Sequence, residues 1–302
     1  MIETYLLAEL SVFAQTGTLT KTATQLHVTQ PSVTRGMQKL EDEFGVQLFD
    51  RQSNSIQLTP TGVLAAKEAA KLLKLNAAMI KKVQNYDQSQ HITAIAATVP
   101  GPLILLNQLQ AQLNSRIQIE SDIISNQQIT DALDNNRYAV IFSDQEIFTD
   151  EVESQYIGEE QLQVNLDQFA YLANQPTITF DELKGMSFIV MRAIGPWSTI
   201  IQDKVSDAKF MYQDDRDAFA EITKYSRFPF FTTNLSQSDP FFNDQVQKDK
   251  DRVSVPISDE SARMVVYANY LISRKKQGLC QPVLMKLYLE SNSFTNWVLF
   301  FD

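Results

Sequence analysis

Residues 30 to 39 concentrate the side chains of this sequence that are best suited to hydrogen bonding with a polyanion. The segment is QPSVTRGMQK, and its polar members are amides, hydroxyls and two cations, at Gln30, Ser32, Thr34, Arg35, Gln38 and Lys39. Amide and guanidinium groups can pair with base edges in a DNA major groove, and hydroxyls and cations can pair with phosphates. The alternative, open to any polar helix face, is that water simply solvates it.

A helix is needed to hold these groups on one face. Thr29 offers a hydroxyl N-cap, Pro31 lies in the first turn, and Gly45 is a stop signal, so a helix is expected between Thr29 and Gly45. Apolar residues at steps of four, three and four predict its buried side, at Val33, Met37, Leu40 and Phe44. Residues 2 to 15 and 19 to 26 also have helical spacing, and the last two of the three helices would form a helix-turn-helix.

A hairpin is expected directly after this helix. Residues 45 to 59 alternate apolar residues on either side of the polar QSNS, which predicts two short strands forming a wing. Arg51, at the base of the wing, is expected to touch a DNA backbone, unless it is neutralised by Asp50 or Glu43.

A long helix is expected to begin at Thr59-Pro60 and to continue to about Asn85, followed by a polar linker to His91. One seam of this helix repeats in steps of four and three, at Ala65, Ala69, Leu72, Asn76, Met79 and Val83. Such a seam suits pairing with a second copy of the chain, with Asn76 setting the register, or packing against its own domain.

The charge is uneven along the chain. Residues 1 to 90 hold nine Lys/Arg and eight Asp/Glu, a net charge of +1, whereas the remainder holds 17 and 28, a net charge of −11. Phosphate attraction needs clustered Lys/Arg, so any DNA contact is expected from the first 90 residues. Paired acids such as Asp214-Asp215 and Glu159-Glu160 are expected to lie on a solvated surface.

The composition limits the cellular compartment and the kinds of catalytic or metal site that can be expected. The opening MIETYLLAEL does not resemble a signal peptide, and no window supplies the roughly 18 apolar residues that a membrane span requires. The single cysteine, Cys280, cannot form an internal disulfide, which fits a cytoplasmic protein. With only His27 and His91 present, no catalytic triad or His-based metal cluster is expected, and an enzyme is not favoured.

The N-terminal residues resemble the LysR-type transcriptional regulators. The matching pieces are TKTATQL, VTQPSVTRGMQKLEDEFGVQLFDR and LTPTG, within residues 5 to 66. The resemblance implies a winged helix-turn-helix followed by a dimerising linker helix. It places near DNA the residues Gln30, Pro31, Ser32, Thr34, Arg35, Gln38 and Lys39, with Arg51 in the wing. Gly36, inside the recognition helix, departs from the expected helix-forming composition.

Beyond residue 91, apolar runs alternate with helical patterns, which predicts an open α/β sheet. The resemblance implies an effector domain with two α/β lobes, similar to a periplasmic solute-binding protein. The expected parts are a DNA-binding domain (1–58), a linker helix and hinge (59–90) and an effector domain (91–302), with lobe I at 91–162 and 268–302 and lobe II at 163–267. Strands should cross between the lobes near 162–166 and 263–267.

Two features of this second part differ from the family pattern. Tyr138 opens the third strand where an acid is usual, and residues 232 to 235 also depart from the usual form.

A small-molecule effector is expected at the carboxyl ends of the strands, where helix N-termini offer free N–H groups. The candidate residues are Thr98, Val99, Pro100, Gly101, Ser125 and Asn126 in one lobe, and Arg192, Trp197, Ser198, Thr199 and Thr232 in the other. Arg192 would suit a carboxylate. The alternative for the hydroxyl and amide residues is that they merely cap helices. No metal or cofactor beyond the effector is expected.

Together these patterns predict a cytoplasmic, effector-responsive transcription regulator that binds promoter or operator DNA as a homodimer or homotetramer. RNA polymerase is a further candidate partner. The first alternative is a solute-binding protein with an incidental N-terminal helical domain, which the missing signal peptide disfavours. The second is an enzyme with an appended DNA-binding domain, which lacks any recognisable catalytic constellation.

Overall fold

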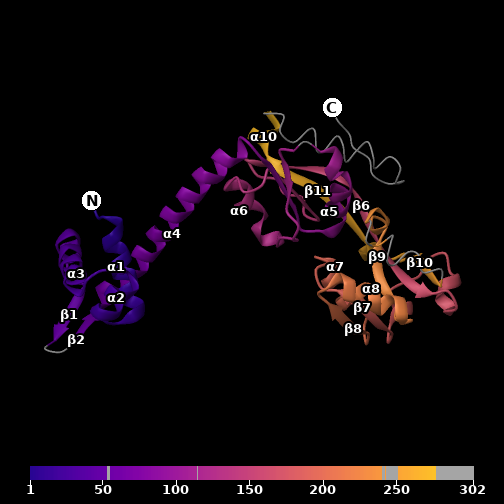
Figure 1. Ribbon diagram of the computed structural model, residues 1–302, viewed down its shortest axis with the longest axis horizontal. Helices are drawn as coiled ribbons and strands as arrows, with labels where there is room; N and C mark the ends of the chain where they lie inside the picture. The colour runs from indigo at the N-terminus through magenta and orange to yellow at the C-terminus, as the bar shows by residue number, and fades with distance from the viewer. Residues whose placement is uncertain (53–54, 114, 240–241, 243–250, 277–302) are drawn as a thin grey trace. The chain divides into compact units, whose positions relative to one another are not determined.

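The computed structural model describes residues 1–276 except 53–54, 114, 240–241 and 243–250 (Figure 1). The chain divides into two compact units, one comprising Met1–Gln84 and a second that begins at Asn85.

Helices and a two-stranded hairpin make up the first unit. Its elements are α1 (Thr4–Thr16), α2 (Leu19–Gln25), α3 (Gln30–Phe44), β1 (Phe49–Gln52), β2 (Ser55–Leu58) and the first part of α4 (Pro60–Ser89). The N-terminus of α3 forms as expected, because the Thr29 hydroxyl accepts the Ser32 N–H at 3.4 Å. Gly45 ends the helix in the left-handed conformation, with φ of 68°.

The core of this unit lies where α1, α2 and α3 pack together. Val33, Met37 and Leu40 are fully buried, and the Phe13 and Phe49 rings meet edge-on with centroids 5.5 Å apart. The expectation that Phe44 completes the buried stripe is wrong, since its side chain is 40% exposed. Leu48 and Phe49, which follow the turn at Gly45, are fully buried in the same core instead.

The second unit contains a curled mixed sheet. Its strands in the described residues are β3 (Thr93–Ala97), β4 (Ile117–Ile119), β5 (Val140–Ser143), β6 (Val152–Asp167), β7 (Ser187–Met191), β8 (Lys209–Gln213), β9 (Phe230–Thr233), β10 (Arg252–Pro256) and β11 (Arg263–Leu271). Their order is β4-β3-β5-β11-β6-β9-β7-β8, with β10 paired to β6. Parallel pairs lie at both ends, and the antiparallel pair of β6 and β11 joins them.

Helices connect the strands at each end of the sheet. The α-helices are α5 (Pro100–Leu109), α6 (Ile129–Asp134), α7 (Trp197–Lys204), α8 (Arg216–Tyr225) and α10 (Ile272–Lys276). Short 3-10 turns are η1 (Gln110–Gln112), η2 (Asn126–Gln128), η3 (Tyr171–Asn174), η4 (Asp181–Leu183), η5 (Ser236–Ser238) and η6 (Glu260–Ala262). The arrangement gives two lobes, with α5 and α6 in lobe I and α7 and α8 in lobe II.

Long strands carry the chain between the lobes. Residues 152–161 of β6 pair with β11, and residues 162–165 already pair with β9 of lobe II. The crossing of β6 therefore lies before the expected segment 162–166. Residues 263–266 of β11 pair only with β6, and β5 joins from Tyr267 onward, so this crossing lies where it was expected.

The expected linker is largely helical. Helix α4 continues to Ser89, and both Asn85 and Ser89 are buried. The Asn85 side-chain amide donates to the Asn135 carbonyl oxygen at 2.9 Å, which fixes this end of the helix within the second unit.

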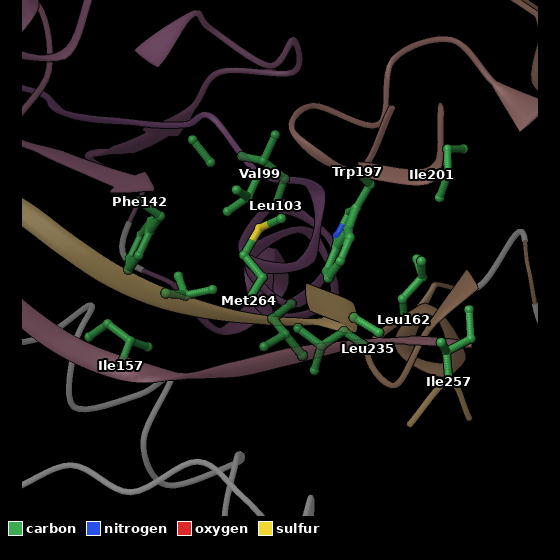
Figure 2. Packing of buried hydrophobic residues seen from close by; sticks show 14 of the residues in the cluster. Val99, Leu103, Phe142, Ile157, Leu162, Trp197, Ile201, Leu235, Ile257 and Met264 are labelled. Atoms are coloured by element: carbon green, nitrogen blue, oxygen red, sulfur yellow. The ribbon is translucent and has the colours of Figure 1, made fainter. Parts of the chain in front are cut away.

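One apolar core contains buried side chains from both lobes (Figure 2). Val99 and Leu103 come from lobe I, Trp197 comes from lobe II, and Met264 comes from a crossing strand. All four lie in one cluster of buried side chains, and the Trp197 indole points toward that cluster in Figure 2.

Candidate nucleic-acid interface and interlobe cavity

Helix α3 has one buried and one exposed face, as its sequence predicts. Val33, Met37 and Leu40 are fully buried, whereas of the seven α3 residues expected near DNA five are exposed and two are half-buried. The exposed residues are Gln30, Pro31, Arg35, Gln38 and Lys39, and the half-buried ones are Ser32 and Thr34. The first unit therefore leaves this polar face available to a partner.

Local hydrogen bonds order the N-terminal half of that face. The Thr20 hydroxyl donates to the Gln30 amide oxygen at 3.2 Å, so α2 helps to orient this residue. The Thr34 hydroxyl donates to the Gln30 carbonyl at 3.0 Å, and Arg35 Nε donates to the Pro31 carbonyl at 3.4 Å. Arg35 makes no ion pair with any described residue, so its guanidinium is available for a base or a phosphate.

Lys39, the second cation of α3, already has an acidic partner. Its Nζ lies 3.0 Å from Oε2 of Glu3, and both side chains are substantially exposed. The hydrogen bond raises the pKa of Lys39 and lowers that of Glu3. A DNA phosphate would therefore compete with Glu3 for this ammonium group.

Arg51 in the wing pairs with Glu41, rather than with Asp50 or Glu43. Its guanidinium lies 2.7 Å from Oε2 of Glu41, whose other oxygen accepts the N–H groups of Leu48 and Phe49. Partial burial alone would raise the pKa of Glu41, but these N–H groups and Arg51 together lower it. No local sequence pattern indicates this pairing, because it depends on how the turn folds back onto α3.

Gly36 is explained by the approach of α1. A Cβ atom at this position would lie 1.8 Å from Oε2 of Glu9, a side chain that is itself almost completely buried. Glycine therefore leaves the space that the Glu9 carboxylate occupies. Burial raises the pKa of Glu9.

The seam of α4 is divided between two environments. Ala65 and Ala69 are buried in the core of the first unit. This part of the seam therefore packs against its own domain, which was the alternative to pairing with a second copy. Farther along, Leu72, Met79 and Val83 are 54%, 58% and 65% exposed, and Asn76 is exposed as well. The same helix carries additional exposed apolar residues, namely Val63, Leu64, Leu75, Ile80 and Tyr86.

A cavity of about 730 Å³ lies between the lobes of the second unit. Its apolar walls include Leu103 and Ile104 from α5 and Ile194 and Phe231 from lobe II. This volume is in the range that accommodates a small organic ligand.

Three of the expected effector residues line this cavity, namely Pro100, Trp197 and Thr232. The others lie outside its lining, and they are Thr98, Val99, Gly101, Ser125, Asn126, Arg192, Ser198 and Thr199.

Several of these residues are buried or already bonded to other groups of the protein. Thr98 and Val99 are buried, and Val99 is the N-cap residue of α5. Ser125 caps η2 by accepting the Gln127 N–H, as the helix-cap alternative anticipates, and the Asn126 side chain donates to Asp144 at 2.9 Å. Arg192 lies 2.7 Å from Asp214, so its charge is already balanced.

Glu160 is a cavity residue that the sequence interpretation placed on a solvated surface, and that expectation is wrong. Its side chain is fully buried on the inward face of β6, and it lines the cavity. Burial raises the pKa of Glu160 to about 7, and the nearby Thr233 hydroxyl, Trp197 indole and Gly101 N–H offset only part of the rise. The alternation of IGEEQLQV along a strand could have indicated the difference, because it puts Glu160 on the same face as Leu162 and Val164.

Tyr138, which stands where an acid is usual, is buried just before β5. Its hydroxyl donates to Oε2 of Glu120 at 2.6 Å. Burial and this carboxylate raise the pKa of Tyr138 to about 12. Tyr138 therefore anchors the start of β5 to the residue that follows β4.

The described part of the chain also bears on membrane spans and metal sites. None of its helices has both the length and the apolar character required to span a membrane. The described residues contain no group of three or more His, Cys, Asp or Glu residues placed to hold a metal ion. Cys280 lies outside the described residues.

Known proteins resemble this chain most clearly at its N-terminus. Residues 6–63 match the family model described as bacterial regulatory helix-turn-helix protein, lysR family. The chain is 36% identical over 98 residues to the HTH-type transcriptional regulator TfdS of Cupriavidus pinatubonensis, covering 30% of this chain and 33% of TfdS. It is 30% identical over 121 residues to the regulator BenM of Acinetobacter baylyi, covering 39% and 40%. The matched segments thus span well under half of these two relatives.

The fold is shared over almost the whole chain. A structure of Vibrio fischeri DarR in complex with DNA has a TM-score of 0.58 at 20% identity and covers 95% of this chain and 97% of DarR. Full-length OxyR from Pseudomonas aeruginosa has a TM-score of 0.51 at 16% identity, covering 96% and 95%. Residues 6–63 therefore resemble the helix-turn-helix domain of the lysR family of bacterial regulatory proteins, and the chain as a whole shares its fold with full-length OxyR and DarR.

Proposed function

We propose that this protein is a sequence-specific DNA-binding transcriptional regulator, and that a small organic effector in the interlobe cavity modulates its activity. The observation that carries the proposal is the exposed polar face of α3, supported from beneath by Val33, Met37 and Leu40. A helix of this kind fits a major groove, where its amide and guanidinium groups meet base edges and its hydroxyls and cations meet phosphates. Two relatives are named as transcriptional regulators, which supports the same conclusion.

The exposed apolar part of α4 is proposed to pair with a second copy of the chain. Leu72, Met79 and Val83 lie at steps of seven and four residues, which suits helix pairing, and their exposure is costly unless a partner covers them. A dimer would place two copies of α3 in successive major grooves, roughly 34 Å apart along the duplex. A tetramer would arise if two such dimers associate.

The effector is proposed to act by favouring one arrangement of the two lobes. The cavity takes its walls from both lobes, so a ligand inside it contacts α5 on one side and Phe231 on the other. A ligand shifts an equilibrium only to the extent that it binds one arrangement more tightly. No cofactor other than this effector and no catalytic reaction is proposed, and the cytoplasm is the proposed site of action.

A binding selection tests the proposed function. The full chain is incubated with a library of randomised duplexes, bound duplexes are recovered over several rounds, and the promoter of its own gene is assayed beside a scrambled duplex. We expect enrichment of a partly palindromic sequence with two half-sites about one helical turn apart. The absence of any enriched sequence, with equal binding to promoter and scrambled DNA, would contradict the proposal and favour a solute-binding protein or an enzyme.

A substitution in α4 tests the dimer in the same assay. Replacing Met79 by Asp should leave a monomer in sedimentation analysis and lose the enrichment for paired half-sites. Replacing Lys74 by Asp, an exposed change of charge on the same helix, is the matched control. A Met79→Asp chain that still forms dimers would place the interface elsewhere.

A further inference from the structure

The wall of the interlobe cavity contains an acid for which the described residues supply no charged partner. Glu160 is 0% exposed, and neither carboxylate oxygen meets hydrogen-bond geometry with any described residue. Trp197 Nε1, which also belongs to the cavity wall, has no hydrogen-bond acceptor of good geometry among the described residues either. A buried ionised carboxylate without a partner is strongly destabilising, so this position is suited to a ligand that supplies one.

The charges around the cavity favour a cation as that ligand. Among the lining residues that the structure describes, Arg216 is the one with a positive charge, and it forms an ion pair with Asp239 of the same wall. Asp214 is paired with Arg192, which lies outside the lining. Asp122 and Glu160 remain as acids for which the described residues provide no ion pair, so a cationic ligand would be attracted.

The same charges disfavour a carboxylate ligand. Arg192 was the residue expected to hold one, but its guanidinium is bound to Asp214 and does not line the cavity. An anion in the cavity would lie close to Glu160 and Asp122 and would meet no uncompensated cation among the described lining residues.

The remaining surface of the cavity is suited to an apolar ligand body. Leu103 and Ile104 of α5 lie on the lobe I side, and Ile194 and Phe231 lie on the lobe II side. Apolar groups of the ligand would replace water along these walls, and removing apolar surface from water favours binding.

We propose that the interlobe cavity binds a small apolar amine, with its ammonium group paired with the Glu160 carboxylate and its hydrocarbon part between α5 and Phe231. This inference rests on the proposed effector function and specifies the chemical class of the effector. The ammonium supplies the partner that the carboxylate lacks, and the hydrocarbon part contacts both lobes at once. Binding therefore favours the arrangement in which the two lobes enclose the ligand.

The affinity for an amine should depend on pH. Because burial holds the pKa of Glu160 near 7, the carboxyl is mostly neutral at pH 6 and mostly ionised at pH 8. An ammonium ligand requires the ionised form, so its affinity should rise roughly tenfold between these pH values. A carboxylate ligand that depends on this residue would show the opposite trend.

The experiment uses isothermal titration calorimetry with the full chain at pH 6 and pH 8. The probes are 2-phenylethylamine and n-pentylamine, compared with the carboxylates 3-phenylpropionate and hexanoate and with the neutral 2-phenylethanol. We expect the amines to bind at pH 8, and the carboxylates and the alcohol to bind at least tenfold more weakly.

Variants test the role of the carboxylate. Glu160→Gln should weaken amine binding at least tenfold and remove its rise with pH. Glu159→Gln, an isosteric change at the neighbouring position of β6 outside the cavity lining, should bind the amines like the wild type. Ile104→Arg changes a half-buried residue of the cavity wall and should also reduce amine binding, which provides a test that does not alter the buried acid.

Several results would overturn the proposal. One is tighter binding of the carboxylates or of the alcohol than of the amines, and another is normal amine binding by both Glu160→Gln and Ile104→Arg. Failure of both amines to bind a chain that still selects a specific duplex would refute the amine proposal and leave the proposed DNA-binding function intact. Failure of duplex selection beside normal amine binding would refute the DNA-binding function alone.

Discussion

Glu9 and Gly36 form a close contact between α1 and the middle of α3, in which a Cβ atom at position 36 would lie 1.8 Å from Oε2 of Glu9. A glycine inside a helix costs roughly 1 kcal/mol relative to alanine. Here the absence of a side chain allows the two helices to approach closely, and Leu6 of α1 and Met37 of α3 are both fully buried. The position of α3 in the first unit thus depends on a residue with no side chain.

Replacing Gly36 by Ala should destabilise the packing of α1 on α3 by about 1–3 kcal/mol, because the methyl group displaces the Glu9 carboxylate. In a Glu9→Ala background the same substitution should be neutral or stabilising by up to roughly 1 kcal/mol, since the clash is gone and the helix propensity is improved. Hydrogen exchange of amides in residues 4–44 of the full chain measures both effects. Equal effects in the two backgrounds would show that the contact does not restrict position 36.

Replacing Glu3 by Gln should strengthen DNA binding, because it releases the Lys39 ammonium for a phosphate and removes a negative charge from the vicinity of α3. We expect a gain of roughly two- to fivefold at low salt that shrinks as salt is added. Fluorescence anisotropy with the selected duplex gives the affinities. Glu68→Gln, which removes the acid paired with Lys71 on α4, is the matched control and should change little. Weaker binding by Glu3→Gln would mean that Glu3 orients Lys39 rather than competing for it.

Protein stability should depend on pH through Glu160. Its pKa is raised in the folded state from an ordinary value of 4.5 to about 7, so the stabilising contribution of the neutral form is complete below pH 4.5 and is lost as pH rises through 7. Between pH 5 and pH 7.5 this loss should reach on the order of 2–3 kcal/mol. The groups around the carboxyl are the Gly101 N–H, the Trp197 indole and the Thr233 hydroxyl, none of which ionises in this range.

Hydrogen exchange of residues 93–166 across this pH range, corrected for the intrinsic exchange rate, measures the effect. Glu160→Gln should have a shallower dependence on pH than the wild type, and Glu159→Gln should follow the wild type. Identical pH profiles for all three chains would mean that Glu160 does not have the raised pKa on which this prediction depends.

The first unit was largely predictable because its signals are local. The Thr29 cap, the Gly45 stop and the apolar spacing of Val33, Met37 and Leu40 each act within one helix, and the structure contains all of them. The partners of Arg51 and Gly36 were not predictable, because Glu41 and Glu9 reach them only after the helices have packed. Phe44 illustrates the same limit, since residues beyond the turn take the core position that spacing assigned to it.

In the second unit, strand and helix patterns do not reveal which distant strands pair or which face of a strand is buried. The alternation of strand and helix patterns predicted an α/β fold. No strand was predicted for Arg252–Pro256, which form β10, and the crossing of β6 begins earlier than expected. Pairing between distant strands decides which face of β6 is buried, and therefore whether Glu160 meets water or the cavity. An acidic pair such as Glu159-Glu160 looks solvated in the sequence, and the pleat of the strand gives its two members different environments.

The central claim, that the polar face of α3 recognises specific DNA, is tested most directly by the affinity of an Arg35→Ala chain for the selected duplex and for a scrambled one. If Arg35 contacts a base, the substitution should weaken binding to the selected duplex by about 1–3 kcal/mol and change binding to the scrambled duplex much less. An unchanged affinity for the selected duplex would contradict the account.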